Sequence, residues 1–195
     1  MSNLVILFPG IGYTCDKPLL YYGRKIAFES GYNDCHLIKF EKIDKTGLQD
    51  NPDKMMKIFN KLFAATKKSL TEIDWTAYDK ILFVSKSIGT IVATAYENEL
   101  VASMREKDIV LPPIKQILFT PLEQTFISHP ANAIGFTGTK DPWCNYSEVI
   151  RLANEQYIPI NVYEDANHSL ETGDSVKDIE NLKNVIEICS RFLNN

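Results

Sequence analysis

The chain reads Lys80-Ile81-Leu82-Phe83-Val84-Ser85-Lys86-Ser87-Ile88-Gly89-Thr90 near its middle, where an apolar run ends in a small-X-Ser-X-Gly turn and a helix-like pattern begins at once. A serine on a sharp turn from a strand to a helix has its hydroxyl pushed out at the sheet edge. Small residues two positions before and two after the serine let the strained backbone close. At the first of these positions, where such turns usually carry glycine, this chain has Ser85. The stretch therefore predicts a nucleophile elbow centred on Ser87.

An acid and a histidine follow later strand-like runs of the chain. Asp141 lies just past the run 133–137, and His168 lies past the run 160–163. Each motif alone is weak evidence, because Ser-X-Gly occurs in ordinary loops and a lone Asp before Pro usually begins a turn. Together they give the order Ser, Asp, His, which is the triad order of the α/β-hydrolase fold. On these residues the chain resembles an α/β-hydrolase, near the small, lidless, dienelactone-hydrolase-like end of that superfamily.

Strand-like and helix-like segments alternate from end to end, which favours an α/β fold with a parallel sheet covered on both faces. Strands are expected over residues 4–8, 35–40, 80–84, 115–119, 133–137 and 160–163. Helices are expected over residues 18–30, 52–70, 88 to about 104, 145–154 and in the last twenty or so residues. The resemblance implies a minimal α/β-hydrolase fold: a doubly wound, mainly parallel six-stranded sheet in the order 2-1-3-4-5-6, lacking two leading strands and any large cap domain.

Three of the expected helices carry recognisable start signals. Asn51 is the expected N-cap of the second helix, with Pro52 at the first helical position. Asn145 opens an Asn-X-X-Glu sequence in which Glu148 can complete a capping box. Asp174 is the expected cap of the last helix.

The three chemical residues have distinct expected roles. A serine hydroxyl is a poor nucleophile at neutral pH, so Ser87 needs a base that takes its proton as it attacks an acyl carbon. His168 is the expected base, and Asp141 is expected to hold its ring in the right tautomer. Glu164 and Asp165 are competing acids, but both are so near His168 in sequence that reaching its far nitrogen demands a tight turn.

The other two histidines fit the role of base less well. His36 lies inside an expected strand, and His129 precedes Pro130 in a connection.

Two backbone N–H groups are expected to stabilise the oxyanion of an acyl transfer. One is the N–H of Ile88, directly after the nucleophile. The loop Phe8-Pro9-Gly10-Ile11-Gly12-Tyr13 resembles the His-Gly-X-Gly loop of the family, which implies that the N–H of Ile11 is the second. Two alternatives are that these glycines only form a turn, or that they cradle a phosphate. The dinucleotide fingerprint would need a further glycine at Cys15, which disfavours the phosphate.

Residues after the carboxyl ends of strands are candidates for substrate binding, because ligands of open α/β sheets bind at that edge. We therefore expect Gly12, Tyr13, Lys86 and Trp143 to bind substrate. For Trp143, packing against the loop of the acid is an equal alternative. Lys86 either favours an anionic substrate or is simply solvated, as most lysines are.

Composition and length bound the class of protein. With 195 residues, the chain fits one domain, 1–195, that buries about 70% of the surface of its unfolded chain. The net charge of −4 is spread along the sequence and predicts no nucleic-acid or anionic-membrane partner. No run is long enough for a membrane span or a signal peptide, so a cytoplasmic location is expected. Four scattered cysteines without a Cys-X-X-Cys pair predict free thiols and no zinc site.

The resemblance implies a serine hydrolase that works through an acyl-enzyme, a carboxylesterase on small or medium acyl esters. Its only expected partner is this small-molecule acyl substrate, and it needs no metal or organic cofactor. Alternatives are a thioesterase, a small-chain lipase, or a hydrolase-fold binding protein without turnover. The last is motivated by Ser85 and by Phe8-Pro9, which depart from the usual glycine and loop histidine. The sequence indicates no oligomeric state.

Overall fold

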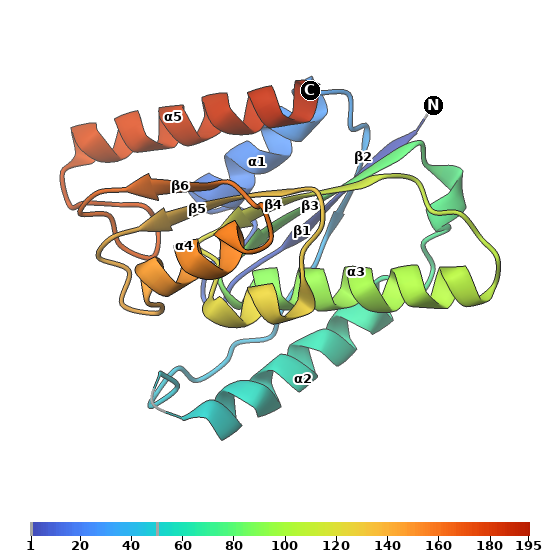
Figure 1. The fold of residues 1–195 in the computed structure, drawn as a ribbon, viewed down its shortest axis with the longest axis horizontal. Coiled ribbons are helices and arrows are strands. Elements are labelled where there is room, and N and C mark those ends of the chain that lie inside the picture. The colour runs from blue at the N-terminus through green and yellow to red at the C-terminus, as the bar shows by residue number, and fades with distance from the viewer. Residues whose placement is uncertain (1, 50) are drawn as a thin grey trace.

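A twisted sheet of six strands runs through the middle of the molecule (Figure 1). The computed structural model describes residues 2–49 and 51–195. The strands are β1 (Asn3–Phe8), β2 (Asp34–Leu37), β3 (Lys80–Lys86), β4 (Ile114–Phe119), β5 (Ala133–Gly138) and β6 (Ile160–Tyr163). All neighbouring pairs are parallel, in the order β2-β1-β3-β4-β5-β6. The predicted fold class and strand order are confirmed.

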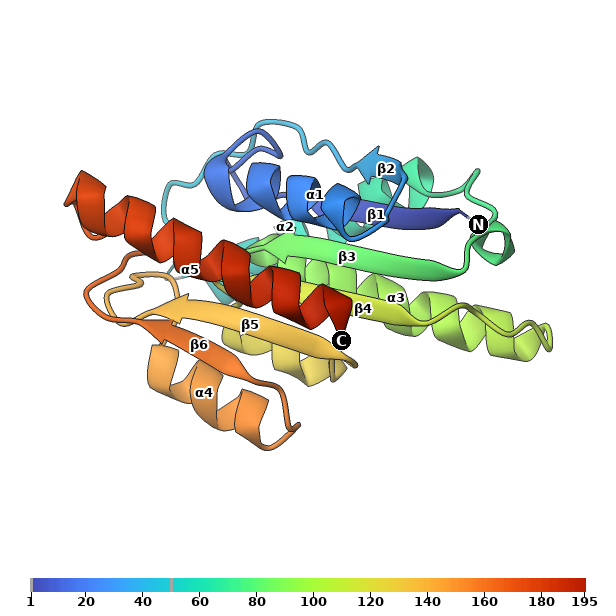
Figure 2. The ribbon, with the colours of Figure 1, turned by 90° about the horizontal axis from the view of Figure 1, so that it is seen from above.

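Helices cover both faces of the sheet. They are α1 (Pro18–Glu29), α2 (Pro52–Ser69), α3 (Ile88–Glu106), α4 (Tyr146–Asn154) and α5 (Ser175–Asn194), with short 3₁₀ turns η1 (Trp75–Ala77) and η2 (Glu123–Ser128). Figures 1 and 2 show α1 and α5 on one face and α2, α3 and α4 on the other. Because side chains of a strand alternate between faces, β3 sends Leu82 and Val84 to the α1–α5 core and Ile81 and Phe83 to the α2–α3 core.

All three expected N-cap residues cap their helices, but the acid expected to complete the capping box of α4 does not take part. Asn51 and Asp174 accept hydrogen bonds from the first-turn N–H groups of α2 and α5. Asn145 caps α4, but its own N–H donates to Glu123 Oε1 at 2.6 Å. Glu148 forms an ion pair with Arg151 at 2.7 Å instead of accepting the Asn145 N–H, so the predicted capping box with Glu148 is wrong.

Strand β2 ends three residues earlier than expected. The last hydrogen bond between β1 and β2 runs from the N–H of Ile38 to the carbonyl of Leu7. In a parallel ladder, the next bond would run from the N–H of residue 9 to the carbonyl of Ile38. Residue 9 is proline and has no N–H, so the ladder stops. The Ile38 carbonyl lies 3.8 Å from the Cys15 thiol instead. The chain thereby leaves the sheet, and residues 45 and 48 of the following segment come to lie beside the residues that follow β3 at the carboxyl edge.

Candidate active site

Ser87 stands alone between the end of β3 and the start of α3. Its backbone angles, φ 58° and ψ −130°, are unfavourable for any residue with a side chain. The conformation is held from both sides, since Ser87 N–H donates to Phe119 carbonyl at 3.0 Å and its carbonyl accepts from Thr90 N–H at 2.8 Å. Ser85 fits without a glycine because its hydroxyl donates to Ile117 carbonyl at 3.2 Å. The backbone therefore has the strained strand-to-helix turn predicted from the sequence.

Gly89 lets the end of β1 cross directly over the first turn of α3. A Cβ at this position would lie 2.5 Å from the carbonyl oxygens of both Phe8 and Pro9. This approach brings the Gly10–Tyr13 turn beside the serine, where a Cβ on Gly10 would be 3.1 Å from Ser87 Cβ. The glycine two residues after the serine is thus required by the backbone in front of it.

The structure brings Ser87, His168 and Asp141 into one hydrogen-bonded chain. His168 Nε2 lies 2.7 Å from Ser87 Oγ, and His168 Nδ1 lies 2.6 Å from Asp141 Oδ2. Asp141 Oδ1 accepts the Trp143 N–H at 2.8 Å, which holds the carboxylate in place. Since the carboxylate accepts a hydrogen bond from Nδ1–H, the proton stays on Nδ1 and Nε2 is left free to accept the serine proton.

Burial shapes the electrostatics of this chain. The Asp141 side chain has no exposed surface, and the His168 side chain keeps 15% of its surface exposed. Desolvation lowers the pKa of His168, the hydrogen bond that its ring donates to Asp141 raises it, and the positive charge of Lys86 lowers it again. The net shift is downward, which favours the neutral imidazole that can act as a base.

The loops after β5 and β6 are packed against each other. A Cβ on Gly138 would collide with the Ala166 carbonyl, so only glycine permits this approach. The N–H groups of Thr139 and Lys140 donate to the carbonyls of Tyr163 and Ala166, both at 3.0 Å. These bonds place the acid of one loop opposite the histidine of the other.

The competing residues lie elsewhere. Asp165 pairs with Lys140 at 2.8 Å on the surface, and Glu164 is exposed. His36 meets Ser69 Oγ at 2.8 Å on β2.

The two residues that carry the expected oxyanion donors lie beside Ser87. Among the described residues, neither the N–H of Ile11 nor that of Ile88 has a hydrogen-bond partner. Both residues line a small depression of about 40 Å³ that also contains Ser87 and His168. The N–H of Ile88 is free because it opens a helix, whose first N–H groups have no intrahelical acceptor.

The rest of this depression is apolar, apart from one lysine. Its remaining lining residues are Lys45, Leu48, Met55, Leu122 and Trp143. Trp143, predicted from the sequence, also packs with its ring centre 6.0 Å from that of His168.

Three lining residues, Lys45, Leu48 and Met55, were not predicted from the sequence. Lys45 and Leu48 come from the segment after β2, and Met55 comes from the first turn of α2. The available signal was that this segment follows the carboxyl end of β2, the edge where ligands bind.

Two grooves flank the depression. The Trp143 groove, about 610 Å³, shares Leu48, Met55, Leu122 and Trp143 with it and continues over Phe59. The Lys42 groove, about 660 Å³, lies between the Gly10–Asp16 turn and the 37–45 segment and includes Gly12. Its rim carries three lysines, namely Lys39, Lys42 and Lys45.

Lys86 and Tyr13 are not on the wall of the depression. Lys86 is 2% exposed, so the expectation of a solvated lysine is wrong. Along β3 it points to the same face as Val84, beneath the site, with Nζ 4.8 Å from the centre of the Tyr13 ring. The Tyr13 hydroxyl accepts the Leu19 N–H at 3.0 Å, which ties this ring to α1. Burial lowers the pKa of Lys86 to about 7.

Three further expectations from the sequence concern membrane spans, metal sites and the cysteines. None of the helices in 2–49 and 51–195 has the length and apolar character needed to cross a bilayer. Within the same ranges, no group of His, Cys, Asp and Glu side chains is arranged to hold a metal ion. All four cysteines are free thiols, as predicted.

Comparison with known proteins gives matches in structure alone. No model of a known protein family matches the sequence, and no curated protein does. An α/β serine hydrolase homologue from Coxiella burnetii matches with a TM-score of 0.57 and 16% identity, over 96% of this chain and 84% of that one. Est1E from Butyrivibrio proteoclasticus matches with a TM-score of 0.59 and 13% identity, over 98% and 86%. The esterase Pf2001 from Pyrococcus furiosus matches with a TM-score of 0.57 and 14% identity, over 97% and 83%.

Proposed function

We propose that this chain, which has the α/β-hydrolase fold, is a serine hydrolase and acts as a carboxylesterase on small or medium acyl esters. The observation that carries the proposal is the hydrogen-bonded chain from Asp141 through His168 to Ser87, with the serine in a strained turn. Three separate strand ends supply these residues, and the strain at Ser87 has no evident structural use.

The first half of the reaction forms an acyl-enzyme. Ser87 Oγ attacks the ester carbonyl carbon while His168 Nε2 takes the hydroxyl proton. The negative charge that develops on the carbonyl oxygen is stabilised by the N–H groups of Ile11 and Ile88, and one such donor is worth about 3–4 kcal/mol in other enzymes. The protonated His168, stabilised by Asp141, then gives its proton to the leaving alkoxide as the carbon–oxygen bond breaks.

The second half releases the acid. Water enters the open depression, His168 takes its proton, and the hydroxide adds to the acyl carbon. The tetrahedral intermediate collapses, the bond to Ser87 Oγ breaks, and His168 returns the proton to the serine. Apart from the ester and this water, both halves use only groups of this chain.

The surroundings of Ser87 support a short or medium acyl chain. The depression itself has room for the reacting ester group, while the Trp143 groove offers an apolar surface beside it. A volume of about 610 Å³ lies within the usual range for small-molecule sites. We assign the acyl chain to this groove and the leaving alcohol to the Lys42 groove.

An activity-based label tests the proposal directly. Treatment with an alkyl fluorophosphonate should add one adduct to the protein, mapped to the peptide with Ser87, because only an activated serine reacts at an appreciable rate. Ser87→Ala should abolish the adduct. Ser169→Ala, which removes the serine next to His168 in sequence, should leave it unchanged.

Folded protein that takes up no label would contradict the proposal and favour a binding protein without turnover. If label is taken up, a series of acyl chain lengths on oxygen and sulfur esters separates an esterase from a thioesterase or a small-chain lipase.

A further inference from the structure

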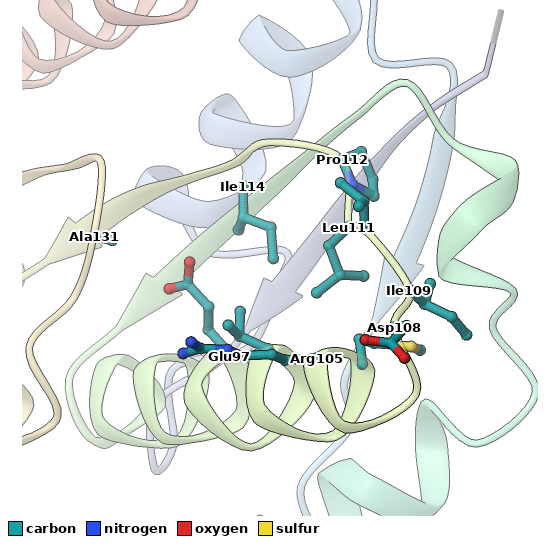
Figure 3. A pocket seen from close by; sticks show the side chains of 11 residues that line it. Glu97, Arg105, Asp108, Ile109, Leu111, Pro112, Ile114 and Ala131 are labelled. Atoms are coloured by element: carbon teal, nitrogen blue, oxygen red, sulfur yellow. The ribbon is translucent and has the colours of Figure 1, made fainter.

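A second hollow lies at the opposite edge of the sheet from Ser87. It has a volume of about 570 Å³ and is formed by the last turns of α3, the 108–113 connection and the start of β4 (Figure 3). Its walls are apolar and are formed by Val101, Met104, Ile109, Leu111, Pro112 and Ile114. Three apolar residues here keep much of their surface in water, with Val101 45%, Ile109 37% and Val110 89% exposed.

The one acid on the inner wall of this hollow is Glu97, which is only 6% exposed. Figure 3 shows its carboxylate extending from α3 toward the start of β4, where Ile114 lies. Gln116 on β4 donates its amide N–H to Glu97 Oε2. Gln116 Oε1 lies 3.3 Å from Thr94 Oγ1, which fixes the orientation of that amide. Within 2–49 and 51–195, no hydrogen bond reaches Glu97 Oε1.

Within the described ranges, the Glu97 carboxylate therefore has one hydrogen-bond donor and no cation to offset its burial. In the described part of the chain no cation pairs with Glu97, and burial raises its pKa to about 7 while the Gln116 amide lowers it. A buried carboxylate with one donor costs free energy, and an apolar side chain would remove that cost. A ligand cation next to Oε1 would offset it, with the apolar walls covering the ligand's hydrocarbon part.

We propose that this hollow is a binding site for a primary alkylammonium, with its charge on Glu97 and its chain along Met104, Leu111 and Ile114. The volume lies within the range of small-molecule sites. Arg105 and Asp108 also border the hollow, but both are exposed and of opposite charge, so at the rim they leave no net charge. The buried charge that a ligand meets is negative. The site is independent of the proposed esterase activity.

The test uses the full-length, isotope-labelled protein and three ligands of the same chain length: n-hexylammonium, hexan-1-ol and hexanoate. In NMR titrations at constant ionic strength, hexylammonium should shift the amides of residues 97–116 saturably. It should bind roughly tenfold or more tightly than hexan-1-ol, because its hydrogen bond to the acid is charge-assisted. Hexanoate should not bind there.

Two matched variants locate the charge. Glu97→Gln should remove the preference for hexylammonium over hexan-1-ol. Glu99→Gln makes the same change two residues away, where the acid pairs with Lys67 on the surface, and should leave the preference intact.

The comparison of ligands on the unsubstituted protein decides the matter even if Glu97→Gln does not fold. Equal affinity for the amine and the alcohol would mean an apolar groove without charge recognition, and would overturn the proposal. So would tighter binding of hexanoate, shifts confined to the Trp143 groove, or no binding of hexylammonium.

Discussion

Lys86 stands next to the proposed nucleophile in sequence, and its side chain runs beneath the site. Burial dominates its titration, and several charges act on it from the surrounding elements. Asp141 and Cys144 on the loop after β5 and Glu171 before α5 favour its charged form, while Lys45 disfavours it. The Tyr13 ring, whose hydroxyl has its own pKa raised to about 12 by burial, covers the amine from the first loop. Lys86 is thus placed to influence His168 through its charge, while its side chain is buried away from the surface of the depression.

Lys86→Met should shift the pH dependence of the proposed esterase activity. The positive charge of Lys86 lowers the pKa of His168, so its removal raises that pKa. His168 must be neutral to act as the base, and activity is lost as the pH falls through its pKa. The acid limb of kcat/KM for a neutral ester should therefore move to higher pH in the variant.

The control for this experiment is Lys68→Met, the same exchange at an exposed residue of α2 that lines neither groove. Its acid limb should match that of the unsubstituted protein. An acid limb that stays in place or moves to lower pH in Lys86→Met would show that the lysine charge does not act on His168.

At the scale of elements, the site depends on how β1, β3 and α3 meet. Helix α3 begins directly after Ser87 with no side-chain cap, and the end of β1 presses on its first turn at Gly89. This contact holds the turn that carries Ile11 against the N-terminus of the helix. The two proposed oxyanion donors are thus positioned by one backbone contact.

Gly89→Ala should separate these elements. The added Cβ would lie 2.5 Å from two carbonyl oxygens, so either β1 or α3 must move. We expect a loss of roughly 1–3 kcal/mol in the free energy of unfolding from overpacking. We also expect roughly a hundredfold slower fluorophosphonate labelling, because misplaced donors no longer meet the oxyanion. Denaturant unfolding and labelling rates measure the two effects.

Ala102→Gly serves as the matched control on the exposed face of α3. It should lower stability by about 1 kcal/mol through helix propensity and leave the labelling rate unchanged. Labelling of Gly89→Ala at the unsubstituted rate would contradict the role given to this contact.

At the scale of the whole molecule, Lys86 and Glu97 are ionisable side chains buried on opposite sides of the sheet. Lys86 lies on the α1–α5 side and Glu97 on the α2–α3 side, and each has its pKa moved toward the neutral form. For both groups the folded state disfavours the charge that water would stabilise. The stability of the fold therefore depends on pH through these two positions.

Lys86→Met should stabilise the fold most at low pH. The pKa of Lys86 is about 7 in the folded protein against an ordinary 10.5, so between these values the unfolded chain holds the extra proton. The cost of burying the amine is then largest below the folded pKa, and it declines as the pH rises toward the unfolded one. The variant should gain on the order of 1–3 kcal/mol near neutral pH.

Denaturant unfolding of both proteins across the pH range measures this difference, in which the shared contribution of Glu97 cancels. Lys68→Met should show little change at any pH. A gain for Lys86→Met that does not shrink as the pH rises toward 10.5 would contradict the burial of a titrating amine.

The sequence by itself determined the type of the elements along the chain and which residues follow the carboxyl ends of β3, β5 and β6, whereas the order of the strands in the sheet was implied by the resemblance to the α/β-hydrolase fold. Local signals are sufficient for the first two of these. Apolar runs mark buried strands, Asn51 and Asp174 mark helix starts, and parallel strands bring their carboxyl ends to one edge. The side chains of Ser87, Asp141 and His168 meet because each follows such an end.

The tertiary structure decided what surrounds each of these side chains. Glu123 takes the place of Glu148 as the acceptor of the Asn145 N–H at the start of α4. Pro9, directly after β1, ends the hydrogen bonding between β1 and β2. Lys86 is buried because Tyr13 covers it, and Lys45 enters the site from the segment after β2. In each case the partner is distant in the sequence. Burial and charge environment are set by such long-range packing, which no local pattern of residues contains.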